Sequence, residues 1–182
     1  MPYTKKVFNL EDGAKITSIK NFITIDDANG LFEELLENVK WRKFTYTVYD
    51  KEVESPRFMH VIYFTSDTKK LPLFNTLKNR IEKKIHKTFN YAVLNYYRNG
   101  DDYISYHADR EVKAGSVVVS VSLGARRKFV LKHKFNKSIK HEFMLSNGDM
   151  LVMNEAAIKT KFKHSVPKMK NVGARISITF RE

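Results

Sequence analysis

The segment Arg175-Ile-Ser-Ile-Thr-Phe-Arg181 alternates strictly between polar and apolar side chains. In a β-strand, successive side chains point to opposite faces, so the two isoleucines and the phenylalanine share one face. The other face carries Arg175, Ser177, Thr179 and Arg181. Such a strand lies either at a sheet edge with its polar side in water, or inside the protein with that side lining a polar site.

Further stretches with the same two-residue period follow one another from Tyr91 onward and predict more strands. They cover residues 91–97, 116–123, 128–132, 142–145 and 150–153. Asn99-Gly100 and Asn147-Gly148-Asp149 are typical turn sequences. Residues 27–39 and 71–89 instead repeat apolar side chains every three or four positions, which predicts two amphipathic helices. This order predicts an α+β, mainly β fold, an antiparallel sandwich or barrel of the jelly-roll type supported by N-terminal helices.

The composition fits one folded domain of 182 residues, with 42% hydrophobic residues, 7 Gly, 4 Pro and no linker-like stretch. Cysteine is absent, which excludes disulfides and thiolate metal ligands. No apolar run is long enough to span a bilayer, and the first residues lack a signal-peptide stretch. We therefore expect an intracellular protein of the nucleus or cytoplasm (the nucleoid if bacterial) that has no contact with a membrane.

The formal net charge of +13 is large for a chain of this size. Such an excess favours a polyanionic partner, and nucleic acid is the first candidate. The alternative is that the lysines only keep the protein soluble. We expect a monomer that requires no protein partner.

His107-Ala-Asp109 and the later His164 together supply two imidazoles and one carboxylate. Residues i and i+2 of a strand point the same way, so His107 and Asp109 can aim at one ion, while His164 must come from a distant strand. This is the ligand set of the facial triad that holds Fe(II) and leaves positions open for an oxidant and a substrate. Structural zinc is disfavoured without cysteine, whereas catalytic zinc stays chemically possible. Taken alone, His-x-Asp also fits a surface pair.

Placed after this triad, the polar face of residues 175–181 is better interpreted as the lining of a site for a small dicarboxylate. A guanidinium binds a carboxylate through two parallel hydrogen bonds, and a hydroxyl can assist. Asn95 and Tyr97 share a strand face shortly before His107. Their amide and phenol groups suit a second carboxylate or a keto acid, and strand packing with a local turn bond is an equally open role.

With these residues in place, the chain resembles the AlkB family of Fe(II)/2-oxoglutarate dioxygenases, above all its animal members that repair alkylated DNA. The likeness covers roughly residues 45–181. The matching motifs follow the family's order and are Asn95-Tyr-Tyr-Arg-Asn-Gly-Asp-Asp-Tyr-Ile-Ser-Tyr-His-Ala-Asp109, Val119-Ser-Val-Ser-Leu-Gly-Ala-Arg-Arg-Lys-Phe129, Lys132-His-Lys134, Gly148-Asp-Met-Leu-Val-Met-Asn154, His164-Ser-Val-Pro167 and the segment 175–181.

The resemblance implies a double-stranded β-helix (jelly-roll) fold in a single dioxygenase domain over residues 1–182. Residues 1–90 would supply helical support and a nucleotide-recognition segment, and residues 91–182 the jelly-roll core. The implied iron ligands are His107, Asp109 and His164. The residues implied to hold 2-oxoglutarate are Asn95, Tyr97, Arg175 and Arg181, assisted by Thr179.

The reaction that the resemblance implies is the oxidative demethylation of N-alkylated bases such as 1-methyladenine and 3-methylcytosine. Fe(II) would be the bound metal, O2 and 2-oxoglutarate would be consumed, and succinate and CO2 would be formed. The hydroxylated alkyl group would then leave as formaldehyde and restore the base. The implied substrate is DNA, and RNA stays open because discrimination of the 2′-hydroxyl depends on the shape of the pocket.

Val48-Tyr49-Asp50-Lys51 precedes Pro56-Arg57 at the distance at which Val-Phe-Gly-Lys precedes Pro-Arg in relatives that repair duplex DNA. The resemblance makes Tyr49 a candidate finger that fills the gap left by a flipped base, and includes Arg57 in the substrate-binding set. An ordinary tyrosine at a hairpin tip is equally compatible. Asp50 replaces the relatives' glycine and places a negative charge near phosphates, which weakens the expectation of duplex binding.

The other substrate contacts that the resemblance implies lie in three segments. Tyr63 (or its neighbour Phe64) would stack on the substrate base, although either could belong to the core. Glu111 matches a carboxylate that touches the exocyclic amine of the damaged base, and a surface salt bridge is its alternative role. Lys168 and Lys170 fall in a basic loop that would meet phosphates, as any exposed lysine could.

Three functions therefore follow from the sequence. The first is an AlkB-like dealkylase acting on nucleic acid. The second is a non-catalytic nucleic-acid-binding module with a vestigial metal site, which the intact triad and arginine pair argue against. The third is an oxygenase of the same chemistry acting on a protein or a small molecule, which the charge of +13 and the segment around Tyr49 argue against.

Overall fold

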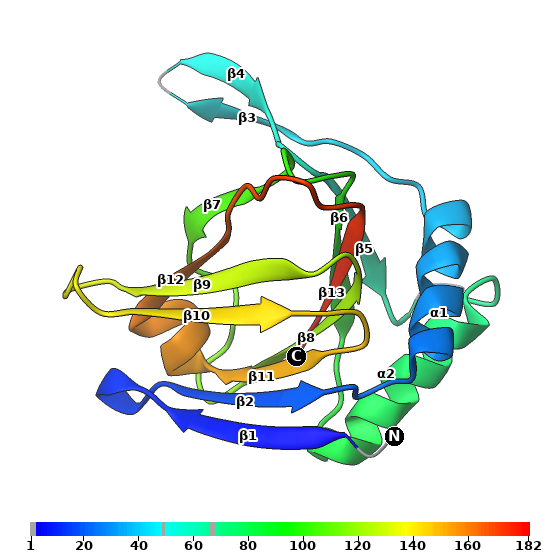
Figure 1. Ribbon diagram of the computed structural model, residues 1–182, viewed down its shortest axis with the longest axis horizontal. Helices are drawn as coiled ribbons and strands as arrows, with labels where there is room; N and C mark the ends of the chain where they lie inside the picture. Colours follow the sequence, from blue (N-terminus) through cyan, green and yellow to red (C-terminus); the bar gives the residue numbers. More distant parts are fainter. Residues whose placement is uncertain (1–2, 49, 66–67) are drawn as a thin grey trace.

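The computed structural model describes residues 3–48, 50–65 and 68–182 of the chain. They form two antiparallel sheets, with helices on the outer face of the larger sheet (Figure 1). The helices are α1 (Ile25–Asn38) and α2 (Pro72–Ile85), and the short helical turns are η1 (Glu11–Gly13) and η2 (Ala156–Thr160). The strands are β1 (Thr4–Asn9), β2 (Lys15–Lys20), β3 (Thr45–Val48), β4 (Lys51–Glu54), β5 (Phe58–Tyr63), β6 (Tyr91–Tyr97), β7 (Ile104–His107), β8 (Val117–Gly124), β9 (Arg127–His133), β10 (Lys140–Leu145), β11 (Met150–Asn154), β12 (Phe162–Val166) and β13 (Arg175–Arg181).

The larger sheet has the strand order β1-β2-β11-β8-β13-β6-β5, and the smaller sheet has the order β10-β9-β12-β7. Most spatial neighbours are not consecutive in the sequence, as in jelly rolls and unlike simple meanders. The hairpin β3–β4 forms a separate two-stranded unit that projects beyond the body of the sandwich (Figure 1). The predicted mainly β, jelly-roll fold with N-terminal helices is confirmed.

Strand β13 carries polar groups into the interior of the sandwich. It lies between β8 and β6, and all seven of its residues are buried. Ile176, Ile178 and Phe180 belong to the core shared with α1 and α2. A second core fills the space between the two sheets. Because the faces of a strand alternate, the polar side chains of β13 point into that space. This arrangement excludes the sheet-edge position that the sequence left open.

Side-chain hydrogen bonds cap α1 and join it to α2. The hydroxyl of Thr24 accepts a hydrogen bond from the backbone N–H of Asp27 (3.1 Å) and so caps the start of α1. The carboxylate of Glu34 on α1 accepts two backbone N–H groups in the first turn of α2 (2.8 Å each). α2 begins at Pro72, as a proline in a first turn allows. It ends at residue 85, earlier than predicted, because His86 adopts a left-handed conformation (φ 57°).

Three strands of the larger sheet were not predicted from the sequence: β1, β2 and β5, which extend it at its two ends. In the smaller sheet, β7 and β12 were expected only as the strands that carry His107 and His164, without bounds. β1 is a lysine-containing edge strand whose residues are mostly exposed, so no buried face marks it in the sequence. In the described parts of the chain, no helix is long and apolar enough to cross a membrane.

Candidate active site

The two histidines of the predicted triad lie opposite each other on neighbouring strands. His107 ends β7, and His164 on β12 is its direct partner in the antiparallel register. Opposed residues of antiparallel strands bring their side chains together on one face. Asp109 follows just beyond the end of β7, where its backbone N–H donates to the carbonyl oxygen of Ile158 in η2 (3.2 Å). The structure therefore brings His164 next to His107 and Asp109, although His164 lies 55 residues after Asp109 in the sequence.

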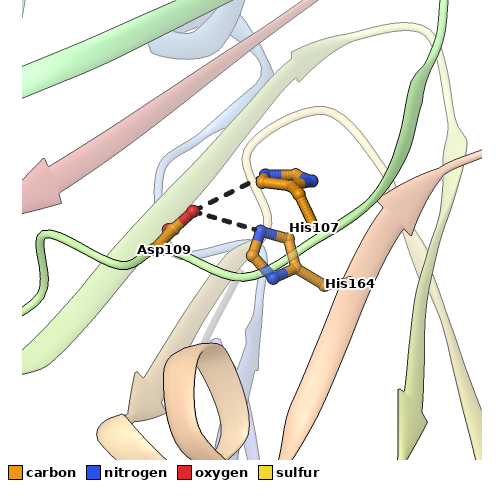
Figure 2. A group of neighbouring side chains, drawn as sticks. All are labelled: His107, Asp109 and His164. Atoms are coloured by element: carbon orange, nitrogen blue, oxygen red, sulfur yellow. Dashed lines mark ion pairs between the residues drawn. The ribbon is translucent and has the colours of Figure 1, made fainter. Parts of the chain in front are cut away.

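The three side chains converge on one point (Figure 2). Oδ1 of Asp109 lies 3.5 Å from Nε2 of His107 and 3.6 Å from Nε2 of His164. One ligand atom from each residue can be chosen so that all three lie within 4.8 Å of one another. Nitrogen and oxygen ligands at about 2.1 Å from a divalent ion, at right angles to each other, are about 3 Å apart. The spacing therefore suits ligands arranged around one metal ion.

The environment of each imidazole orients a free nitrogen toward this point. Nδ1 of His107 lies 2.9 Å from the carbonyl oxygen of Ser105, to which it donates, so Nε2 keeps its lone pair. The ring of His164 stacks against Phe129 at 5.5 Å. Burial lowers the pKa of His107. Burial, followed by the repulsion that a protonated His107 would exert, holds the pKa of His164 well below its usual range. Both imidazoles are thus neutral at pH 7, as metal binding requires.

Arg181 connects the triad to β13. Its Nη2 donates to Oδ2 of Asp109 (2.8 Å), which leaves Oδ1 facing the histidines. Its Nη1 pairs with the carboxylate of Glu111. Burial raises the pKa of Asp109, whereas the charge of Arg181 acts in the opposite direction. Nε of Arg181 is buried and has no hydrogen-bond partner among the described residues.

A cavity between the two sheets opens next to the triad. The larger sheet contributes mostly polar groups to its wall, and the smaller sheet contributes mostly apolar ones. The lining residues are Asn95, Tyr97, Ile104, His107, Asp109, Ser120, Phe129, Met153, Ile158, His164, Val166, Ser177, Thr179 and Arg181. Four of the five residues predicted to hold 2-oxoglutarate therefore line one cavity with the three predicted iron ligands.

Arg175, the fifth residue of that set, lies beside the cavity wall. It is 1% exposed, its Nε donates to the hydroxyl of Ser122 (2.8 Å), and its guanidinium lies 5.4 Å from the centre of the Tyr97 ring. Burial lowers the pKa of Arg175 to about 10, so the group remains charged at pH 7. In the described part of the chain it pairs with no carboxylate, and its Nη1 has no hydrogen-bond partner. A buried cation of this kind needs an anionic partner.

Asn95 is linked to Arg57, which immediately precedes β5. Its side-chain oxygen accepts a hydrogen bond from Nε of Arg57 (2.6 Å), so Arg57 reaches the edge of the cavity. Thr179 shares the cavity wall with Ser177, whose hydroxyl lies 3.2 Å from that of Ser120. Hydroxyl and amide groups therefore accompany the guanidinium groups, as the sequence predicts.

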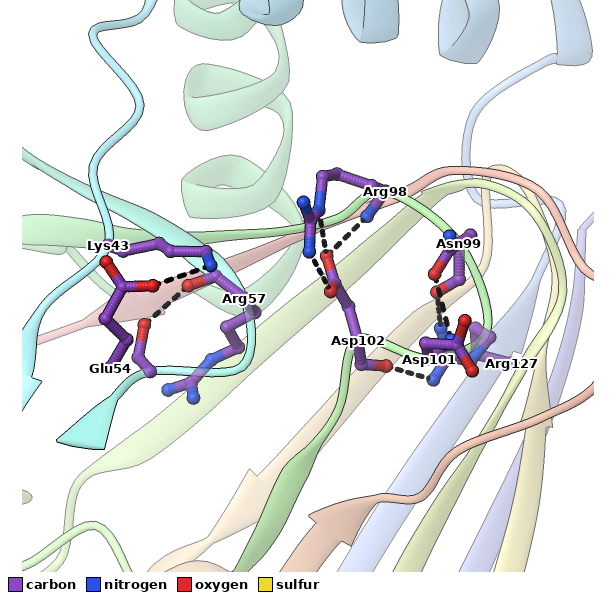
Figure 3. A network of polar contacts seen from close by, with 9 residues as sticks. Lys43, Glu54, Arg57, Arg98, Asn99, Asp101, Asp102 and Arg127 are labelled. Carbon is purple, nitrogen blue, oxygen red and sulfur yellow. Dashed lines mark hydrogen bonds and ion pairs between the residues drawn. The ribbon is translucent and has the colours of Figure 1, made fainter.

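A buried arginine that the sequence did not single out supports this wall. Arg127 is 0% exposed and lies 5.3 Å from the centre of the Tyr97 ring. It donates to three backbone carbonyl oxygens, those of Asn99 (2.9 Å), Asp102 (2.7 Å) and Pro167 (2.8 Å). The carboxylate of Asp102 pairs with Arg98 in the same loop (Figure 3). Arg127 thus fixes the loop after β6 and the loop before β13 at once.

The remaining substrate contacts predicted from the sequence are more scattered. Tyr49 lies outside the described residues. Tyr63 is 57% exposed, so it is not a core residue. Its ring centre lies 5.8 Å from that of Tyr91, its partner on β6, and Tyr91 is in turn paired with Arg181 on β13. Lys168 and Lys170 are exposed on the loop between β12 and β13. Tyr63, Lys168 and Lys170 do not border the cavity.

The residues present fit a divalent metal and a dicarboxylate. Two neutral imidazoles and a carboxylate converge without a protein cation between them, as expected for metal ligands. The buried, uncompensated guanidinium of Arg175 fits a carboxylate. The triad and the polar face of β13 line the same cavity, so both groups would meet there.

Comparisons with known proteins agree with this geometry. The model of the family described as the 2OG-Fe(II) oxygenase superfamily matches residues 15–181. DNA oxidative demethylase ALKBH2 of Bos taurus is 36% identical over 123 residues, which cover 62% of this chain and 44% of that protein. Alpha-ketoglutarate-dependent dioxygenase alkB homolog 3 of Homo sapiens is 28% identical over 189 residues, which cover 92% and 66%. The chain thus spans less than two thirds of either relative's length.

A solved structure described as "The structure of OsALKBH1" superimposes with a TM-score of 0.66. The match covers 92% of this chain and 97% of that one at 15% sequence identity. At such low identity the likeness supports the fold alone.

Proposed function

Because the chain belongs to the 2OG-Fe(II) oxygenase superfamily, and within it to the AlkB-type oxygenases, we propose that it oxidatively demethylates N-alkylated bases in nucleic acid. The enzymes of this superfamily use Fe(II), 2-oxoglutarate and O2. The observation that carries the proposal is the convergence of His107, Asp109 and His164 in one cavity with the arginine wall of β13. The preferred lesions proposed are 1-methyladenine and 3-methylcytosine.

His107, Asp109 and His164 would hold the iron. Bound together, Fe(II), 2-oxoglutarate and O2 supply the oxidising chemistry, in which the keto acid gives succinate and CO2 and one oxygen atom enters an N-methyl C–H bond. The N-hydroxymethyl product then loses formaldehyde, and the base is restored. Arg181 keeps the carboxylate of Asp109 oriented, because its Nη2 donates a hydrogen bond to Oδ2, the oxygen that does not face the histidines.

The wall of the cavity would hold 2-oxoglutarate. Arg175 offers a buried cation with a free Nη1, and the Tyr97 ring beside it shapes the pocket. Asn95 and Thr179 line the same cavity and supply an amide and a hydroxyl. Arg181 is already paired with carboxylates of this chain, so its role toward the keto acid requires at least the bond to Glu111 to open.

The relatives' printed names and the charge of +13 support nucleic acid as the substrate. We place Arg57, Tyr63 and Glu111 at the base-recognition side of the site. Lys168 and Lys170, with Tyr49 as the candidate finger, would meet the strand itself. The proposal treats residues 1–182 as one dioxygenase domain acting on DNA as a monomer, with RNA as a substrate to be compared directly.

The test is demethylation of oligonucleotides that carry 1-methyladenine or 3-methylcytosine, in single- and double-stranded DNA and in RNA. The protein receives Fe(II), 2-oxoglutarate and ascorbate under nitrogen, and air starts the reaction. We expect a loss of one methylene mass and formation of succinate. Asp109→Ala should abolish both products, while the matched variant His141→Ala, a histidine outside the site, should retain them.

Two results would redirect the proposal. Succinate formation without demethylation of any strand would indicate the same chemistry on another substrate. Strand binding without either product, in protein shown to contain iron, would favour a non-catalytic binding module.

A further inference from the structure

The surface beside His107 is hollowed and strongly basic. Two hollows share Tyr106, Lys134 and Lys163, so they form one continuous surface that we call the basic track. One of them is also lined by His107, whose side chain is 36% exposed, so the track reaches the candidate metal site. The cations of the track are Arg110, Lys132, Lys134, Lys137, Lys159 and Lys163. No carboxylate of the described residues lines either hollow.

No described carboxylate neutralises the cations of the track. None of the six forms an ion pair with a carboxylate in the described part of the chain, although lysines elsewhere do, such as Lys20 with Asp149 and Lys78 with Glu82. The ammonium of Lys134 donates a hydrogen bond to the backbone carbonyl oxygen of Lys159. Burial, followed by the neighbouring charges of Lys163, Arg110 and Lys159, lowers the pKa of Lys134. A hollow lined by like charges attracts a polyanion.

Tyr106 gives the track a planar apolar face. It precedes His107 on β7, and because the faces of a strand alternate, the two side chains leave the strand on opposite sides. Tyr106 is 41% exposed, and Nζ of Lys132 lies 5.9 Å from the ring centre. An exposed aromatic ring among lysines is the arrangement with which proteins stack unpaired bases while cations follow the backbone.

We propose that the basic track binds a single nucleic-acid strand, with the base next to the reacting nucleotide stacked on Tyr106 and its phosphates on the surrounding lysines. The inference rests on the proposed function for the identity of the polyanion. It adds a second nucleotide subsite, on the side of β7 opposite to the triad. An acidic peptide would satisfy the lysines but has no regular partner for the exposed ring, so the strand is favoured.

The experiment measures binding without turnover. The full chain is titrated into a fluorescent, unmodified single-stranded oligonucleotide of about 10 nucleotides, and anisotropy is read at several salt concentrations. Tyr106→Ala should weaken binding roughly 10-fold, since a stacked base contributes that much in comparable sites. Tyr106→Phe keeps the ring and should bind like the unmodified protein. Both changes lie at an exposed position, and thermal melts confirm that the variants fold.

A charge variant tests the phosphate contacts separately. Lys132→Ala with Lys163→Ala should reduce the slope of log K against log salt by about 1.4, because each lost phosphate contact on a single strand removes about 0.7. Lys83→Ala on the exposed side of α2 is the matched control and should leave the slope unchanged.

The outcomes separate this inference from the proposed function. If Tyr106→Ala and the double lysine variant bind the strand as tightly as the unmodified protein, the track is wrong even when demethylation is observed. If they lose binding while no lesion is ever repaired, the track stands and the proposed function falls. Tighter binding of an acidic peptide than of the strand, lost in the same variants, would overturn the assignment of the partner.

Discussion

Replacing Arg127 with methionine should destabilise the protein and loosen the 2-oxoglutarate wall without touching the metal ligands. Methionine fills much of the same volume but donates no hydrogen bond. The guanidinium is 0% exposed and makes three hydrogen bonds to backbone carbonyls, at 2.7–2.9 Å. Two of these carbonyls lie in the loop after β6, and the third precedes β13.

The expected magnitude follows from those three bonds. A buried hydrogen bond from a charged donor contributes about 1.5 kcal/mol at the low end, so three contribute about 4.5 kcal/mol. Burial lowers the pKa of Arg127, which means that the folded state already bears a cost for enclosing this charge. Because losing that cost offsets part of the effect, we expect a net loss below about 4.5 kcal/mol, or a fall in Tm below roughly 9–18 °C for a chain of this length.

Urea unfolding and thermal melts measure the loss, with Arg126→Met as the control because that neighbouring arginine is exposed. Anaerobic titration with 2-oxoglutarate, followed by the visible band of its iron complex, should show weaker binding in Arg127→Met at unchanged iron affinity. A free energy of unfolding within about 0.5 kcal/mol of the unmodified protein would refute the supporting role of Arg127.

Three further predictions concern the backbone, the histidines and the arginine wall. Gly100→Ala would place a Cβ 1.6 Å from the carbonyl oxygen of Met169, so its Tm should fall by several degrees, whereas Gly173→Ala, whose Cβ meets its nearest atom at 4.0 Å, should melt normally. Burial lowers the pKa of His164 below its value in the unfolded chain, which is near 6.5. The metal-free protein should therefore keep its stability above pH 6.5. As the pH falls further it should lose stability, because the unfolded chain then binds a proton that the folded protein does not. Unfolding free energies from pH 5 to 8 should therefore slope less in His164→Gln, and an equal slope would contradict the assignment. Arg175→Lys should bind 2-oxoglutarate at least about 10-fold more weakly, since an ammonium cannot form the paired bonds of a guanidinium; unchanged affinity in the same anaerobic titration would exclude Arg175 from the site.

The sequence predicted most reliably where burial imposes a simple period. The alternation of residues 175–181 identified β13, since its apolar face packs on the helices and its polar face enters the sandwich. The same pattern could not show whether the strand was central, because its neighbours β6 and β8 come from much earlier in the chain. β12, which carries His164, mixes apolar, charged and polar residues and was expected only as a distant strand.

The residues that the sequence did not reveal act through partners that have no sequence signature. Arg127 binds backbone carbonyls, which every residue has, so nothing in its surroundings marks it. Lys134 and Lys163 lie in one hollow only because β9 and β12 are neighbours in the smaller sheet. The pairing of Glu111 with Arg181 likewise depends on the turn that follows β7.

The measurement that tests the central claim most directly is a single turnover with quantified products. Protein loaded under nitrogen with Fe(II), 2-oxoglutarate and a strand containing 3-methylcytosine is mixed with O2, and succinate, formaldehyde and repaired base are counted. The site described for His107, Asp109 and His164 predicts equal amounts of all three, and none from Asp109→Ala. Repaired base without succinate, or equal repair by Asp109→Ala, would contradict it.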